Sequence, residues 1–172
     1  IGRLRQLRDL QLSGTQAGDM TLAALEQLNR LDDLGLGGRL TDLGMQSLAS
    51  LVSLRRLKIS AAEQVTDGGL EFFWRLRNLR SLQLEASQVT GANWQALAEL
   101  PNLESVKIAS DRFADAGLQT LADSKSLQRL TVRVGKQGSS SVTDDGVGAL
   151  RKLETLRQLT LPRASSRVTN AA

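Results

Sequence analysis

A short segment that recurs along the chain is the feature that most constrains its fold. It reads VTDGGL at residues 65–70 and returns as LTDLGM (40–45), VTGANW (89–94), FADAGL (113–118) and VTDDGV (142–147). A weaker copy, AGDMTL, occupies residues 17–22, and an interrupted copy, VTN, begins at Val168. The six longer copies end 23, 25, 24, 24 and 29 residues apart. Self-similarity with this period predicts a stacked array of structural repeats.

A second motif lies between these copies and predicts a strand. Each occurrence ends in an apolar–polar–apolar alternation, which is the period of a half-buried strand. The seven occurrences are LRDLQL (7–12), LDDLGL (31–36), LRRLKI (54–59), LRSLQL (79–84), LESVKI (103–108), LQRLTV (127–132) and LRQLTL (156–161). After each of the first six, the apolar spacing changes to helical steps, as at Leu70, Phe73 and Leu76. This spacing predicts a short helix with one buried stripe.

The TDxG segment marks the point where each strand gives way to a helix. The Thr66 hydroxyl is placed to accept a hydrogen bond from an amide of the first turn as an N-cap. Asp67 brings negative charge to the positive end of the helix dipole, and Gly69 lets the backbone turn tightly beside the preceding repeat. A ring of carboxylates that binds cations is the alternative interpretation. Its members would be Asp19, Asp42, Asp67, Asp115 and Asp144.

A strand signature LxxLxL followed by a helix, within about 24 residues, resembles the leucine-rich repeat family over essentially the whole chain. The TDxGL segment is most similar to subtypes with a helix on the convex side, namely F-box-type repeats and related bacterial repeats. The resemblance implies an α/β leucine-rich-repeat solenoid: a right-handed horseshoe arc with parallel strands on the concave face and short helices on the convex face. About seven strands and six helices are expected.

Two positions depart from the family pattern. Leu100 stands where the cysteine-containing F-box subtype has Cys. The Asn that commonly follows the strand signature is also missing, so no continuous Asn ladder is expected. The residues in its place are Thr15, Arg39, Ala62, Ser87 and Asp111.

Composition agrees with a single repeat domain over residues 1–172. Hydrophobic residues make up 41% of the chain, enough for a sizeable core, although one repeat buries its apolar side only by stacking on its neighbours. No run approaches the roughly 18 apolar residues of a membrane span, and no signal peptide is visible. We therefore expect a cytoplasmic location. Because the chain opens on Ile1 and ends inside a repeat copy, we also expect a fragment of a longer chain.

The chemistry of the side chains argues against an enzyme. The sequence has no His, Cys or Tyr, which leaves carboxylates, Lys and hydroxyls as the only acid, base or nucleophile candidates. The segment GKQGSSS (135–141) lacks the spacing of a phosphate-binding loop. We predict no catalytic residue, no metal site, no cofactor and no small-molecule substrate.

The outward positions of the strands are the predicted interaction site, since this architecture usually binds partners on its concave face. Acidic residues, Asp9 and Asp33, occupy the first two strands, and basic residues follow from the third strand onward. We predict binding of another protein with an acidic surface, assisted by the longer loop of residues 133–145. The predicted partner-binding residues are Arg56, Lys58, Gln83, Glu85, Lys107, Arg129 and Arg133. A plain solvated sheet face is the alternative.

Two further functions stay open. The family resemblance offers, as an alternative function, the substrate-recognition part of a larger ubiquitin-ligase or effector protein. The net charge of +4 would also permit weak nucleic-acid binding. Nucleic acid is the less favoured partner, because the strand face has no aromatic side chain on which bases would stack.

Phe72 and Trp74 are the remaining ambiguity. Both lie outside the Leu positions of their helix, and the matching positions of neighbouring helices hold mostly small residues. The rings therefore either lie flat over these small residues or form a hydrophobic docking patch on the convex side.

Overall fold

Strands and helices alternate along the chain in the computed structural model, which describes residues 4–134 and 141–162. The strands are β1 (Asp9–Gln11), β2 (Ala17–Gly18), β3 (Asp33–Arg39), β4 (Arg56–Ser60), β5 (Ser81–Glu85), β6 (Ser105–Ser110), β7 (Arg129–Val134) and β8 (Gln158–Thr160). The helices are α1 (Asp19–Leu25), α2 (Asp42–Leu48), α3 (Gln95–Ala98), α4 (Asp115–Leu121) and α5 (Asp144–Ala149). Two 3₁₀ helices, η1 (Asp67–Arg75) and η2 (Leu150–Lys152), complete the set in the described part of the chain.

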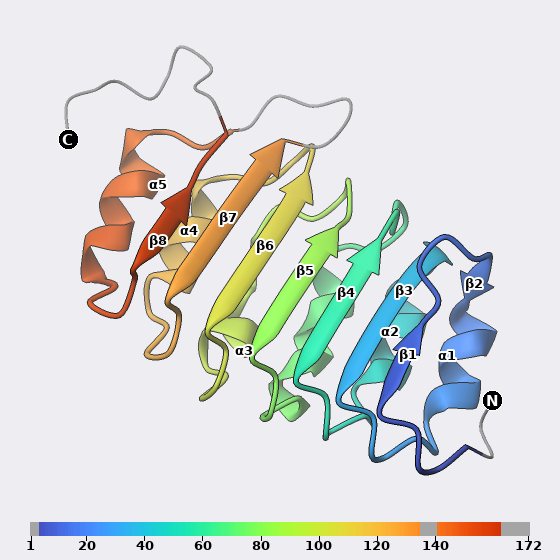
Figure 1. Cartoon of the computed structure of the whole chain (residues 1–172). Coiled ribbons are helices and arrows are strands. Elements are labelled where there is room, and N and C mark those ends of the chain that lie inside the picture. Colours follow the sequence, from blue (N-terminus) through green and yellow to red (C-terminus); the bar gives the residue numbers. More distant parts are fainter. Residues whose placement is uncertain (1–3, 135–140, 163–172) are drawn as a thin grey trace.

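The strands form one parallel sheet whose spatial order follows the chain order, β1-β3-β4-β5-β6-β7-β8 (Figure 1). These are the seven strands that the sequence motif predicts. The short β2 is an addition, and it pairs only with β3. Because each strand lies beside the strand of the preceding repeat, every repeat packs against its neighbours in sequence, as a solenoid requires.

The strand register confirms the predicted repeat alignment. Leu34 pairs with Leu10 on one side and with Leu57 on the other, and Leu57 pairs in turn with Leu82. Leu34, Leu57 and Leu82 are at most 2% exposed. Burying one such side chain contributes roughly 1.5–3 kcal/mol, so the aligned leucines form a continuous core along the array.

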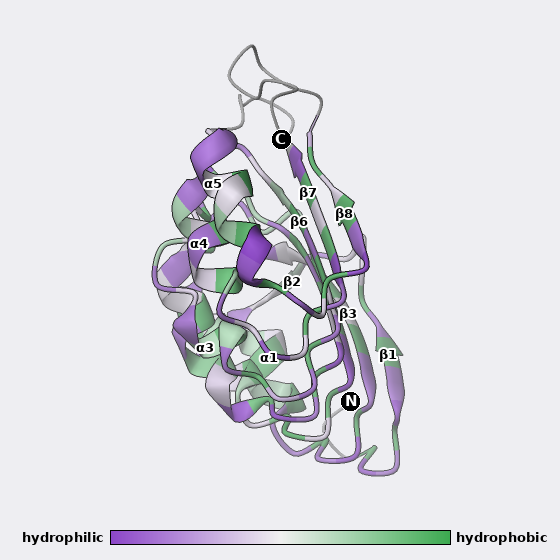
Figure 2. Ribbon diagram, turned by 90° about the vertical axis from the view of Figure 1, so that its left-hand side faces the viewer, coloured by the Kyte–Doolittle hydropathy of each residue, from purple (hydrophilic) through white to green (hydrophobic). Residues whose placement is uncertain are grey.

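The helices form a second layer on one face of the sheet (Figure 2). Buried apolar side chains of the strands and the helices form one core cluster. In the described part of the chain, the opposite face of the sheet, called here the strand face, has no helix over it (Figure 2). The sequence places the six helical segments correctly but not their type. The third segment is the 3₁₀ helix η1, whose Leu70 and Phe73 are buried, as is Leu76 directly after it. A 3₁₀ helix has three residues per turn, so these residues lie on one side of it.

The fourth helical segment, α3, is only four residues long. Asn93, two residues before it, has a left-handed backbone with φ of 61°. Since a left-handed residue cannot belong to a right-handed helix, the helix begins after Asn93 and loses its first turn. The buried Trp94 follows directly and occupies the predicted core position.

Candidate functional site

The Asp at the start of four of the helical segments connects its repeat to the next one. Asp42 accepts two hydrogen bonds from Thr66: the backbone N–H donates at 2.8 Å and the hydroxyl at 2.6 Å. The same pair of bonds recurs from Thr41 to Asp19, from Thr90 to Asp67 and from Thr143 to Asp115. Bonds from a donor to an ionised carboxylate are about twice as strong as neutral ones. The Asp residues therefore act mainly between repeats, not only within their own helix.

The Thr of the segment has the predicted capping role as well. The hydroxyl oxygens of Thr41, Thr66 and Thr143 each accept a hydrogen bond from the backbone N–H two residues later. One hydroxyl thus accepts from its own helix and donates to the carboxylate of the preceding repeat. This double use satisfies a free helix amide and the carboxylate together.

The Gly of the segment makes room for that carboxylate. A Cβ atom added to Gly69 would lie 2.6 Å from Oδ1 of Asp42, and one added to Gly146 would lie 2.1 Å from Oδ1 of Asp115. Any side chain at these positions would push the preceding Asp out of its hydrogen bonds. Thr, Asp and Gly therefore recur together because they are three parts of one contact between adjacent repeats.

At the boundary between the fourth and fifth repeats, which lies within the described residues, neither the Asp nor the Thr of this contact is present. Gly91 stands at the Asp position of the fourth repeat, and Ala114 stands at the Thr position of the fifth. The backbone N–H of Ala114 instead donates to the carbonyl of Thr90 at 3.0 Å. A Cβ at Gly91 would lie 2.4 Å from Cα of Gly117. Close backbone packing replaces the carboxylate at this boundary.

These hydrogen bonds argue against the interpretation that the carboxylates bind cations. Four of the five proposed ligands, Asp19, Asp42, Asp67 and Asp115, already accept hydrogen bonds from the next repeat. No group of three or more metal-ligating side chains occurs among residues 4–134 and 141–162. The carboxylates belong to the repeat contacts.

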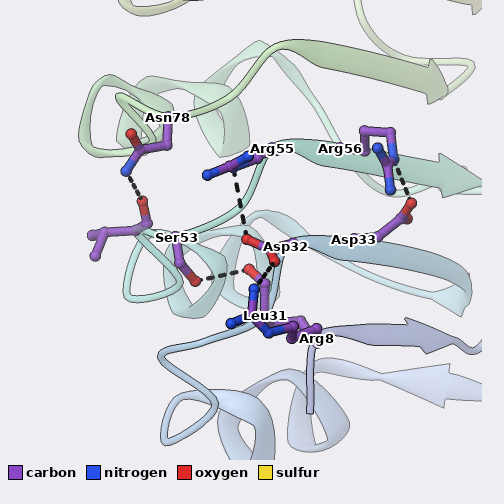
Figure 3. A network of polar contacts seen from close by, with 9 residues as sticks. Arg8, Leu31, Asp32, Asp33, Ser53, Arg55, Arg56 and Asn78 are labelled. Carbon is purple, nitrogen blue, oxygen red and sulfur yellow. Dashed lines mark hydrogen bonds and ion pairs between the residues drawn. The ribbon is translucent and has the colours of Figure 1, made fainter. Parts of the chain in front are cut away.

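A second series of polar contacts joins the repeats at the turns that precede the strands (Figure 3). The Ser53 hydroxyl donates to the carbonyl of Leu31 at 2.8 Å, and the Asn78 amide donates to the carbonyl of Val52 at 2.9 Å. Asn102, Ser126 and Thr155 repeat this arrangement in later repeats. No continuous Asn ladder was expected after the strands, and these turn contacts satisfy backbone carbonyls at the other end of the strands.

Only part of the strand face is open. Gly35 and Gly37, in outward positions of β3, are buried. A Cβ at Gly35 would lie 2.0 Å from Oε1 of Gln11, whose side chain also donates to Asp9 and Asp33. Gln11 of the first repeat thus covers this part of β3, whereas Arg56 and Lys58 on the next strand, β4, are exposed.

Arg56 is engaged within the protein. Its guanidinium forms a hydrogen-bonded ion pair with Asp33 on the adjacent strand (Figure 3). The hydrogen bond to Asp33 and then the charge of that carboxylate raise the pKa of Arg56 above its ordinary value. Among residues 4–134 and 141–162, the basic side chains of Lys58, Lys107, Arg129 and Arg133 have no acidic partner within 4 Å.

Four of the seven predicted partner-binding residues surround one groove. It has a volume of about 790 Å³ and lies over the carboxyl-terminal ends of β4 to β7. Gln83, Glu85, Lys107 and Arg133 line it, and Glu63 and Arg112 from the following loops contribute to its rim. Arg56, Lys58 and Arg129 lie on the same sheet outside this groove. Sequence reasoning missed Glu63 and Arg112, because they follow the strands and carry no periodic signal.

Comparison with solved structures identifies the architecture. An internalin C2 from Listeria monocytogenes is 25% identical, with a TM-score of 0.59 over 94% of this chain and 54% of its own. An internalin (inlF) from Listeria monocytogenes is 17% identical, with a TM-score of 0.60 over 96% of this chain and 56% of its own. The fold is a leucine-rich-repeat solenoid. This leucine-rich-repeat chain thus spans about half the length of these two structures, and no protein-family model or curated protein matches it.

On the helix side of this leucine-rich-repeat array, Trp74 is not covered. It is 58% exposed, and the Arg75 guanidinium carbon lies 5.8 Å from its ring centre. Phe72 is half-buried. Because Trp74 is mostly exposed, its ring is not buried flat over small residues, as one of the two interpretations expected.

Two predicted features fall partly or wholly outside the described residues. Residues 135–140 of the longer loop and the repeat copy at Val168 are among them. Within the part of the leucine-rich-repeat chain that the structure describes, no helix is long and apolar enough to cross a membrane.

Proposed function

We propose that this leucine-rich-repeat chain is a protein-binding module whose partner docks on the open part of the strand face, from β4 to β7. The internalin likeness supports a protein-interaction scaffold in general terms. This proposal covers the binding face, the partner and the activity of any longer protein that contains this chain.

The observation that carries the proposal is the row of basic side chains without acidic partners. Lys58, Lys107 and Arg129 extend from the open strand face, and in the described part of the chain they form no ion pair within 4 Å. Their charges are therefore available to an acidic partner surface. Electrostatic complementarity of this kind raises the association rate and selects between partners.

The test is a pair of double variants with the same change in charge. Lys58→Glu with Arg129→Glu reverses two charges on the strand face, and Arg56 is left in place because it is bonded to Asp33. Arg151→Glu with Lys152→Glu reverses two exposed charges on η2, at the helix layer. A partner is first isolated with the unmodified chain, and its affinity for both variants is then measured.

We expect the strand-face variant to bind the partner roughly tenfold more weakly, which corresponds to about 1.4 kcal/mol, and the η2 variant to bind it normally. All four side chains are exposed, so both variants should keep the melting temperature of the unmodified chain. If the η2 variant alone loses affinity, the partner docks on the helix layer and the proposal is wrong.

The salt dependence of the binding affinity distinguishes a protein partner from a nucleic-acid partner. Binding of a nucleic-acid backbone weakens steeply with salt because counterions are released. Affinity that survives moderate salt supports the protein partner. The subtype of repeat, the cytoplasmic location, the single-domain boundaries of residues 1–172 and a role in substrate recognition within a larger protein stay predictions.

A further inference from the structure

The groove on the strand face has opposite charges on its two sides. Glu85, Ala109 and Arg133 occupy the same register position on the adjacent strands β5, β6 and β7. Neighbouring strands lie about 4.8 Å apart, so Glu85 and Arg133 are anchored roughly 10 Å from each other. Ala109 between them has no side chain long enough to fill the gap. The floor of the groove is therefore open at Ala109, with the Glu85 carboxylate on one side and the Arg133 guanidinium on the other.

The surrounding charged residues follow the same division. Glu63 follows β4 and Glu85 ends β5, so the first side of the groove is acidic. Lys107 lies on the middle strand β6, Arg112 follows β6, and Arg133 lies on β7, so basic side chains line the middle and the second side of the groove. Asp111 also lines the groove, and it makes an interaction of its own in the structure.

The two sides do not neutralise each other. Within residues 4–134 and 141–162, Glu85 and Arg133 make no ion pair within 4 Å. The Glu85 carboxylate accepts a hydrogen bond from the Gln83 amide at 3.2 Å. Both side chains are exposed. The charges are therefore held apart by the strand register, and each is available to a ligand.

We propose that this groove binds a peptide segment of the partner protein that carries a basic and an acidic side chain together, the basic one facing Glu85 and the acidic one facing Arg133. This inference rests on the proposed function and specifies the partner's chemistry. A segment with charges of one sign only would be attracted by one side and repelled by the other. An extended chain advances about 3.3 Å per residue, so side chains about three residues apart span the distance.

The probes are three synthetic peptides of equal length in a Gly, Ser and Thr background. One has Lys residues in one half and Glu residues in the other, the second has only Lys, and the third has only Glu. Each is presented on streptavidin tetramers, so that weak single contacts are multiplied by avidity, and its binding to the immobilised full chain is measured. We expect the mixed peptide to bind roughly threefold to tenfold more tightly than either single-sign peptide, the range for one or two exposed ion pairs.

Two variants should change this preference in opposite directions. Glu85→Lys makes the groove basic, so the all-Glu peptide should become the tightest binder. Lys107→Glu with Arg133→Glu makes it acidic, so the all-Lys peptide should become the tightest binder. The matched controls, Glu154→Lys and the pair Arg151→Glu with Lys152→Glu, change the same charges at exposed sites outside the groove and should keep the original order.

The inference is overturned if the unmodified chain does not prefer the mixed peptide, if the groove variants keep its order of binding, or if the controls alter that order equally. The variants Lys58→Glu and Arg129→Glu lie outside the groove. Loss of partner binding in that pair with no peptide preference would therefore leave the proposed function standing and remove only the inference about the groove.

Discussion

The indole Nε1–H of Trp94 donates a hydrogen bond to Oδ1 of Asp67 at 2.8 Å, across the boundary between the third and fourth repeats. Asp67 also accepts bonds from the hydroxyl and backbone N–H of Thr90 and from the N–H of Gly91. Trp94 is fully buried, and its ring centre lies 5.3 Å from that of Phe113 in the fifth repeat. One side chain thus connects three consecutive repeats.

Replacing Trp94 with Phe should therefore lower the free energy of unfolding. The loss should be about 2 kcal/mol, because a buried hydrogen bond to a charged group disappears, and the smaller ring adds a packing defect. Urea denaturation followed by circular dichroism measures the effect. Trp74→Phe is the control and should change stability little, since Trp74 is mostly exposed. Equal losses in both variants would contradict the assigned role of Trp94.

Replacing Thr66 with Val should destabilise the array by about 1 kcal/mol, because the variant loses an N-cap and a hydrogen bond to Asp42 at nearly constant size. Thr66→Ser keeps the hydroxyl and should keep most of the stability. Thermal unfolding of the two variants makes the comparison. If Ser is as damaging as Val, the methyl group and not the hydroxyl stabilises this boundary.

Gly91 and Gly14 form a matched pair for separating backbone strain from steric overlap. Both have a left-handed backbone, with φ of 91° and 81°, but only Gly91 has another backbone within reach of an added Cβ. Gly14→Ala should cost about 1–2 kcal/mol from the backbone conformation alone. Gly91→Ala should cost roughly 1–3 kcal/mol more, because the methyl group overlaps Gly117. Chemical denaturation of both variants measures the difference, and equal losses would exclude the steric term.

The two tryptophans should respond differently to a collisional quencher. Trp74 is 58% exposed and Trp94 is fully buried. In the Trp94→Phe variant, iodide should quench nearly all the remaining fluorescence. In the Trp74→Phe variant, emission should be shifted to shorter wavelength and resist iodide until the chain unfolds. Strong protection of Trp74 would mean that another molecule or segment covers this part of the helix layer.

The repeat, the strands and their register were predictable from sequence because they depend on local periodicity. Leu34, Leu57 and Leu82 align side by side because each occupies the same place in its motif. The N-cap role of Thr66 is also local, since donor and acceptor are two residues apart. The seven strands and six helical segments follow from these patterns, whereas the 3₁₀ form of η1 does not.

The sequence by itself determined that the chain is an array of strand and helix repeats, since the spacing of apolar residues decides which side of each element is buried. Only the tertiary structure decided which partners several of the charged residues have. From sequence, Asp42 is expected only to place a charge at a helix end, yet its carboxylate accepts a hydrogen bond from Thr66, one repeat away. Arg56 reads as an available cation, yet it is paired with Asp33. Glu85 and Arg133 face each other across Ala109 because parallel pairing brings distant strands into register, and that neighbourhood is absent from the linear chain.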